Sequence, residues 1–287
     1  MKNRKKPLKK YLLILVTSLL VIFAGIYFWA SRNDQPDTEN TAASEQPAPE
    51  QEPLEPAYVT PDLQPTVDSW ITKYPADYSI SIYDLQSNTV VAENNPEESI
   101  FSASLYKLYI AYLSLLDFQS GDQDPAEIII AGQTKKECVD KMIRESDSPC
   151  GEAMMADIGQ ATLTNRVASI DMNATVFNGI TTSASDSVKL LTLIDQDKNL
   201  EQSNREFLLD AMLTQPAKYK RGLQSGAPDA KWYTKVGWNL DINYHDIGIL
   251  ELPDGKKFAV AILGQGSGSP VPIANFADTI YTALTAQ

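Results

Sequence analysis

The sequence predicts an α+β fold, in which an antiparallel sheet is flanked by helices and an all-helical lobe is inserted between its strands. Two segments near the start of the folded part, 78–85 and 88–94, alternate polar and apolar residues as strands do. Three more strand-like segments lie near the end of the chain, and the long stretch before them has only helical patterns. A sheet built from both ends of a chain fits this order better than a parallel βαβ arrangement.

The N-terminal part is expected to be a membrane anchor. Residues 1–10 hold six Lys and Arg and precede 11–30, an uncharged apolar run of 20 residues, which is long enough for a helix to cross a bilayer. A cleaved signal peptide is the alternative, but the run is too long for one and no small-x-small cleavage site follows it. We therefore expect a single-pass protein of the cell membrane with its N-terminus in the cytoplasm and the rest of the chain outside.

Residues 31–65 are acidic, rich in Pro and without an apolar period, which predicts a disordered linker. Residues 66–287 are the predicted folded domain, and they carry 17 basic against 29 acidic residues, a net charge of −12. Such a surface argues against nucleic acid or anionic lipid as a partner of this domain, which we expect to be monomeric. The single histidine rules out a multi-histidine metal site, and no cofactor is expected.

The elements of the domain follow in order. The turn-like Gln-Ser-Asn at 86–88 joins the first two strands as a hairpin, and 103–118 is apolar nearly all round, as a buried helix is. Further helices are expected at 134–146, 151–159, 162–170, 183–194 and 201–213. Strands follow at 232–238, 244–252 and 257–266, and a last helix covers 271–286.

Ser104 and Lys107 lie three residues apart at the start of the buried helix, so they share one face. A serine hydroxyl becomes a nucleophile when a base lies within hydrogen-bond reach, and a desolvated, neutral lysine amine is such a base. Taken alone, the pair is also what an ordinary polar helix end looks like, because short motifs match readily by chance.

Two further motifs follow in order along the chain. Ser146-Asp147-Ser148 lies in the turn after the helix 134–146, and Lys235-Val236-Gly237 lies on a late strand. Together with Ser-x-x-Lys, these variants of Ser-Asp-Asn and Lys-Thr-Gly resemble the signature set of class A β-lactamases and penicillin-binding proteins, over roughly residues 66–287. The resemblance implies the β-lactamase/transpeptidase-like fold and an active-site serine hydrolase.

The resemblance also implies a role for each matching residue. Ser104 is expected to be the acylated nucleophile, Lys107 its base, Ser146 the group that passes a proton to the leaving amine, and Lys235 the positive charge that meets the substrate carboxylate. The backbone N–H groups of Ser104 and Trp238 are expected to form the oxyanion hole. Ser148 and Gly237 are expected to contact the substrate. The alternatives are that Ser146 and Asp147 only form a turn at a helix end, and that Lys235 is an ordinary solvent-exposed lysine.

The sequence departs from the family at three places. The loop 169–182 before the Thr-Thr pair contains no Glu, and Ala174 stands about where the deacylating glutamate is expected, with Asp171 near the loop's start. Val236 replaces a hydroxyl residue, and Ser148 replaces an amide. Acylation therefore remains expected, and efficient release of the acyl group does not.

Other designs remain open at this stage. His245 and Ser104 would form a Ser-His pair if they met, and Cys138 and Cys150 are either a disulfide that holds the Ser146 turn or two reduced buried thiols. A catalytic thiol would need a histidine partner, which neither cysteine has nearby in sequence. The leading hypothesis is a membrane-anchored serine hydrolase acylated by β-lactams or peptidoglycan stem peptides, and the alternative is an inactive domain of this fold that binds peptidoglycan or a protein partner.

Overall fold

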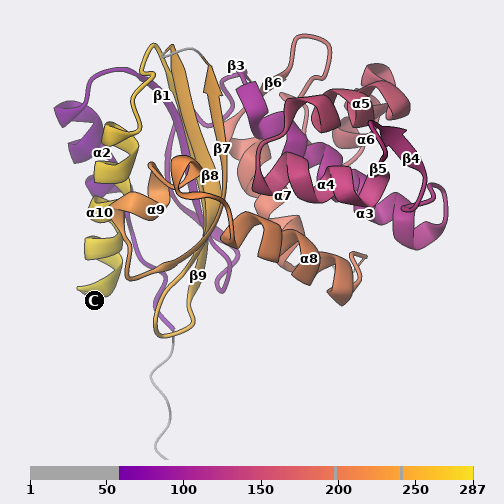
Figure 1. Ribbon diagram of the computed structural model, residues 1–287. Coiled ribbons are helices and arrows are strands. Elements are labelled where there is room, and N and C mark those ends of the chain that lie inside the picture. Colours follow the sequence, from indigo (N-terminus) through magenta and orange to yellow (C-terminus); the bar gives the residue numbers. More distant parts are fainter. Residues whose placement is uncertain (1–57, 197–198, 240–241, 287) are drawn as a thin grey trace, which may run out of the picture. The chain divides into compact units, whose positions relative to one another are not determined.

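The structure, a computed structural model, describes residues 58–196, 199–239 and 242–286 (Figure 1). The basic segment 1–10, the expected anchor 11–30 and residues 31–57 of the expected linker lie outside the described residues. Within the described ranges, no helix is both long and apolar enough to span a membrane.

An antiparallel sheet of five strands forms the centre of the folded part, in the order β2-β1-β9-β8-β7. Its strands are β1 (Asp77–Asp84), β2 (Thr89–Asn94), β7 (Lys231–Asn239), β8 (Asn243–Glu251) and β9 (Lys257–Gln265). The predicted hairpin and the three late strands are confirmed. The first hairpin joins the last strand through β1 and β9, with Ile80 opposite Ile262. The sheet is therefore built from both ends of the domain, as predicted.

Each face of the sheet buries its own apolar cluster, because successive side chains of a strand point to opposite faces. On one face Leu250, Val260 and Ile262 pack with residues of α2 (Gln64–Lys73), α9 (Leu223–Gly226) and α10 (Val271–Thr285). On the other, Ile247, Ile249 and Ala261 pack with the helices that form the helical lobe. Figure 1 shows the same division, with α2, α9 and α10 on one side of the sheet and α3 to α8 on the other.

The helical lobe surrounds α3, whose residues 106–115 are all buried. The lobe contains α3 (Tyr106–Ser120), α4 (Lys135–Arg144), α5 (Ser148–Ile158), α6 (Gln160–Ala168), α7 (Ala184–Gln196) and α8 (Gln202–Leu213). All were predicted, with boundaries shifted by a few residues. Each fully buried Leu or Ile of α3 contributes roughly 1.5–3 kcal/mol, so this apolar helix forms the centre of the lobe's core.

The folded part begins earlier than the predicted boundary at residue 66. Leu63 is 1% exposed in the core, and α2, which the sequence analysis did not predict, starts at Gln64. Pro65 lies in the first turn of that helix, where its missing N–H would have no partner anyway. The linker predicted for 31–65 therefore extends too far, because a proline that starts a helix was interpreted as part of a tether.

Several short elements had no counterpart in the sequence analysis. The strand β3 (Ile100–Phe101) pairs with β6 (Thr181–Thr182), and β4 (Ile128–Ile130) pairs with β5 (Gln133–Thr134). Thr134 also caps α4, since its hydroxyl accepts from Glu137 N while the Glu137 carboxylate accepts from Thr134 N. The described residues also include the single-turn 3-10 helices η1 (Ala103–Leu105) and η2 (Ala217–Tyr219).

Candidate active site

Ser104 lies in η1, a 3-10 turn that leads directly into α3. The residue before it, Ala103, has a left-handed backbone with φ of 46°. Such a conformation costs a non-glycine residue of the order of 1–3 kcal/mol, and it persists only where the surroundings enforce it. Ser102 N donates to Ile180 O at 2.8 Å, which fixes the start of this turn on the loop after α6. The half-buried Ser104 is thus held on a strained turn directly before the first residue of α3.

Lys107 is fully buried, and its amine meets three oxygens. Its Nζ lies 3.2 Å from Ser104 Oγ, 2.6 Å from Ser146 O and 3.2 Å from Ser148 Oγ. No ion pair to a carboxylate is found for this lysine within the described part of the chain. Burial lowers the pKa of Lys107 to about 8, although the charges of Asp147 and Glu152 act in the opposite direction. A neutral amine within hydrogen-bond distance of a serine hydroxyl is therefore accessible near neutral pH, as the first motif predicted.

Ser146 and Ser148 reach this site from the turn between α4 and α5. Ser146 has φ of 53°, and Asp147 caps α5 by accepting from Cys150 N at 2.8 Å. Cys138 of α4 and Cys150 of α5 form a disulfide across the turn, so the alternative of two reduced thiols is not observed, and neither is a free thiol for catalysis. The turn is held by a cap at its end and by a covalent link across it.

Lys235 extends from β7 to the other side of Ser146. Its fully buried amine donates to Ser146 Oγ at 3.0 Å and to Val236 O at 2.7 Å. Burial holds the pKa of Lys235 well below its usual range, the charge of Lys107 lowers it further, and Asp246 opposes both. Because the two amines flank one serine in a buried site, they repel each other when both are charged. The structure thus brings Ser104, Lys107, Ser146 and Lys235 together in one chain of contacts, and Lys235 is not a solvated lysine.

Gly237 and Trp238 lie on β7, the edge strand of the sheet, which pairs with β8 alone among the strands of the described residues. A Cβ atom at Gly237 would lie 2.6 Å from Ser102 O and 2.9 Å from Leu105 Cγ. Gly237 is therefore required for the close approach of β7 to η1, in addition to the substrate contact expected from the sequence. Trp238 is 49% exposed. An oxyanion hole made by Ser104 N and Trp238 N stays a prediction, as do the substrate contacts of Ser148 and Gly237.

His245 does not meet Ser104, so the alternative Ser-His pair is wrong. Its Nε2 lies 2.9 Å from Phe101 O, and the ring is fully buried in the sheet. Burial lowers the pKa of His245 to about 4, which keeps the ring neutral at physiological pH. This histidine holds β3 against β8 and has no contact with the proposed nucleophile.

The loop without glutamate folds back on itself. Val176 and Thr181 form an isolated bridge, and the buried Asp186 of α7 accepts from Ala174 N at 2.9 Å and from Thr175 Oγ1 at 2.8 Å. Ala174 thus contributes a backbone group to a structural contact. Asp171 has a left-handed backbone, and its carbonyl accepts from Lys189 Nζ at 2.7 Å. In the described residues, no carboxylate of this loop hydrogen-bonds Ser104 or Lys107.

Gln215 is a site residue that the sequence analysis missed. Its buried Nε2 donates to Ile143 O of α4 at 2.9 Å and to Thr234 O of β7 at 3.0 Å. One amide thereby ties the helix that precedes Ser146 to the strand that carries Lys235. Gln215 follows α8 in a short connection, and no pattern in the sequence distinguishes it from other loop residues.

Solved structures of similar fold are described either as PBP-A or as beta-lactamases. A structure of a PBP-A mutant, described as an acyl-enzyme complex with penicillin G, is 19% identical, covers 80% of this chain and 100% of its own, and has a TM-score of 0.71. An ancestral class A beta-lactamase is 17% identical over 77% of this chain and 99% of its own, with a TM-score of 0.71. A beta-lactamase from Chitinophaga pinensis is 16% identical over 77% and 98%, with a TM-score of 0.69.

At these identities the structural likeness shows the fold, which is the α+β arrangement predicted from the sequence. No curated protein matches the chain in sequence. The model of the beta-lactamase enzyme family matches residues 62–284, which is most of the chain and includes all three motifs. The chain belongs to the beta-lactamase enzyme family.

Proposed function

We propose that this protein is a membrane-anchored extracytoplasmic serine hydrolase that is acylated on Ser104 by a β-lactam or by a peptide amide of the cell wall. The observation that carries the proposal is the contact of 3.2 Å between Lys107 Nζ and Ser104 Oγ, made by a lysine whose pKa burial lowers to about 8. A buried amine without a carboxylate partner is unfavourable for stability, and proton abstraction from a serine is a function that needs it.

The reaction follows from this arrangement. Lys107 takes the proton of Ser104 Oγ as that oxygen bonds to the substrate carbonyl carbon, and the C–N bond breaks as Ser146 Oγ gives its proton to the leaving nitrogen. The proton held by Lys107 then returns to Ser146 Oγ, so the acyl-enzyme has a neutral Lys107 and an intact Ser146 hydroxyl. Ser146 is suited to this transfer because its Oγ accepts from Lys235 Nζ at 3.0 Å and its carbonyl accepts from Lys107 Nζ at 2.6 Å. Lys235, at the edge of the sheet, would meet the substrate carboxylate.

The test is covalent labelling. The purified chain is incubated with a fluorescent penicillin and with a peptide ester that ends in D-alanine, and the modified residue is identified by mass spectrometry. We expect an adduct on Ser104 that is absent from Ser104→Ala. If neither reagent labels wild type, although circular dichroism shows a folded chain, the hydrolase proposal fails.

The second candidate is an inactive domain that binds peptidoglycan or a protein partner. It is favoured by the loop 169–182, which contains no Glu and whose backbone at Ala174 is bound to the buried Asp186. Binding of muropeptides that is equal in wild type and Ser104→Ala, without covalent labelling of wild type, would support this candidate. Loss of turnover in Ser104→Ala would exclude it.

A further inference from the structure

Release of the acyl group from Ser104 is the step for which the sequence supplies no obvious base. An acyl-serine is an ester, and its hydrolysis requires a group that takes a proton from the attacking water. Two carboxylates beside the motifs are already engaged, since Asp147 caps α5 and Asp186 accepts from Ala174 N and Thr175 Oγ1. A base for this step, which rests on the proposed function, must come from another element.

The element that lies against Lys107 on the other side is α5. Ser148, in its first turn, has its Oγ 3.2 Å from Lys107 Nζ. A Cβ atom at Gly151 would lie 2.9 Å from Lys107 Cε and 2.9 Å from the Tyr106 hydroxyl, so the helix backbone packs closely on both residues. Glu152 is next to Gly151 and one turn after Ser148, and residues four apart in a helix share a face. Its carboxylate therefore starts from the face of α5 that carries the Ser148 contact.

The charge of Glu152 is felt at the site. Its negative charge acts to raise the pKa of Lys107, against the larger effect of burial. Burial raises the pKa of Tyr106 to about 12, and the charge of Glu152 acts in the same direction. Glu152 is also exposed, and it makes no hydrogen bond or ion pair in the described part of the chain. An exposed carboxylate on the helix that packs against Lys107 has access to water and is not committed to a structural contact.

We propose that Glu152 is the general base for hydrolysis of the acyl-enzyme at Ser104. The carboxylate takes a proton from a water molecule as the water oxygen bonds to the ester carbon. The ester C–Oγ bond then breaks, and Ser104 Oγ receives the proton that Glu152 took from water, passed on through the neutral Lys107 amine. Glu152 and Lys107 thereby return to the carboxylate and the neutral amine, so the products are a free acid and the free enzyme. The helix α5 thus supplies the glutamate that the loop 169–182 lacks.

The experiment separates acylation from release. The full chain and Glu152→Gln are mixed with nitrocefin, and the burst, the steady rate and the mass of the Ser104 adduct over time are measured. We expect the burst of Glu152→Gln to remain within about threefold of wild type, and its steady release to fall about 100-fold. Glu206→Gln is the control, because Glu206 is an exposed carboxylate of α8 that accepts a hydrogen bond from Gln202 Nε2 on the same helix.

Each outcome decides between the two proposals. An adduct that disappears equally fast from wild type and Glu152→Gln overturns the role of Glu152 and leaves the hydrolase proposal intact. An adduct on wild-type Ser104 that is not released also overturns the role of Glu152, and it leaves the proposed acylation of Ser104 intact. If no adduct forms on wild type, the hydrolase proposal itself fails. Partial recovery of release in Glu152→Asp, with the burst unchanged, is expected from a base and not from a residue that only supports the fold.

Discussion

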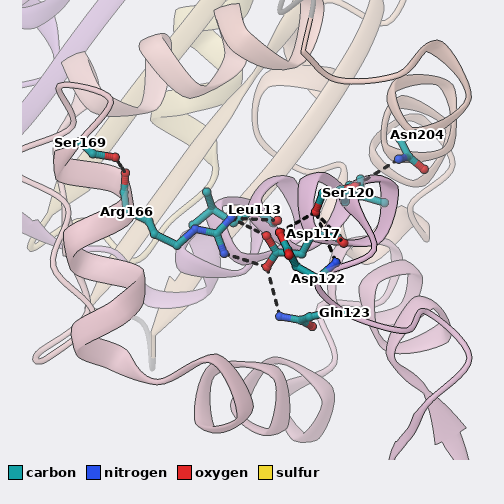
Figure 2. A network of polar contacts seen from close by, with 9 residues as sticks. Leu113, Asp117, Ser120, Asp122, Gln123, Arg166, Ser169 and Asn204 are labelled. Atoms are coloured by element: carbon teal, nitrogen blue, oxygen red, sulfur yellow. Dashed lines mark hydrogen bonds and ion pairs between the residues drawn. The ribbon is translucent and has the colours of Figure 1, made fainter.

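The buried charged residues at the two ends of α3 differ in whether they have a partner of opposite charge. At the start of the helix, the Lys107 amine has hydroxyl and carbonyl oxygens within hydrogen-bond distance and no carboxylate partner among the described residues, and burial lowers its pKa to about 8. At the end, Asp117 accepts two hydrogen bonds of 2.7 Å from the Arg166 guanidinium of α6 and one of 3.1 Å from Gln123 Nε2 (Figure 2). The matched pair stabilises the lobe, whereas the unmatched amine is kept ready to exchange a proton.

The difference also lies in where each cluster is tied. The cluster around Asp117 joins α3 to α6 and to the turn after Ser120, all within the helical lobe (Figure 2). The cluster around Lys107 joins α3 to the turn between α4 and α5, and through Ser146 to β7. One cluster therefore supports a lobe, and the other depends on the lobe and the sheet being correctly placed. Four substitutions or measurements test this contrast.

The largest effect is expected at Lys107. Lys107→Met keeps the length of the side chain and removes the base, so acylation of Ser104 should slow about 10³-fold. The melting temperature should stay equal or rise, because an amine is no longer desolvated. Stopped-flow labelling with a fluorescent penicillin and thermal denaturation measure the two quantities. A large fall in melting temperature would show that this lysine mainly supports the fold.

The opposite result is expected at Asp117. Asp117→Ala leaves the Arg166 guanidinium without its partner and should lower the free energy of unfolding by about 3 kcal/mol. The acylation rate of the folded protein should change less than about twofold, since the reaction does not use this pair. Urea denaturation and labelling check these values. Asp122→Ala, at an exposed carboxylate that accepts from Ser120 Oγ, is the matched control and should have little effect on either.

The pH dependence of acylation tests the state of Lys107. Its neutral form is the base, so the rate should rise as the pH increases through the pKa of about 8 and level off above it. Between pH 7 and pH 9 the rate should increase about tenfold, from the titration of a single group. Labelling rates measured across this range at constant salt provide the check. A flat profile would mean that the amine is already neutral at pH 7 or is not the base.

The smallest effect is expected at Gln123, which adds one hydrogen bond of 3.1 Å to the Asp117 carboxylate. Gln123→Ala should lower the free energy of unfolding by about 0.5–1.5 kcal/mol, because the carboxylate keeps both contacts to Arg166. The acylation rate should not change. A loss as large as that of Asp117→Ala, measured by urea denaturation, would mean that the amide and not the guanidinium holds the pair together.

The sequence predicted the parts of this site that depend on long periodic elements. The apolar run of the buried helix and the three-residue spacing placed Ser104 and Lys107 together, and the order of the motifs placed Ser146 and Lys235 beside them. Two-residue strands such as β3 have no period, and Pro65 concealed the start of α2. Gln215 and Glu152 could not be found, because one amide in a loop and one acid on a helix look like surface residues until their neighbours are known.

The join between β1 and β9 has a consequence for the order of folding. Ile80 pairs with Ile262, so this contact closes a loop of nearly the whole domain. Contacts at such separation form slowly, because the chain must lose much of its freedom before they are made. The helices of the lobe have neighbours close in sequence and can form first. Ser104 and Lys107 can therefore meet early, and we expect Ser146 to meet Lys235 only in a late stage of folding, after the sheet that carries Lys235 has formed.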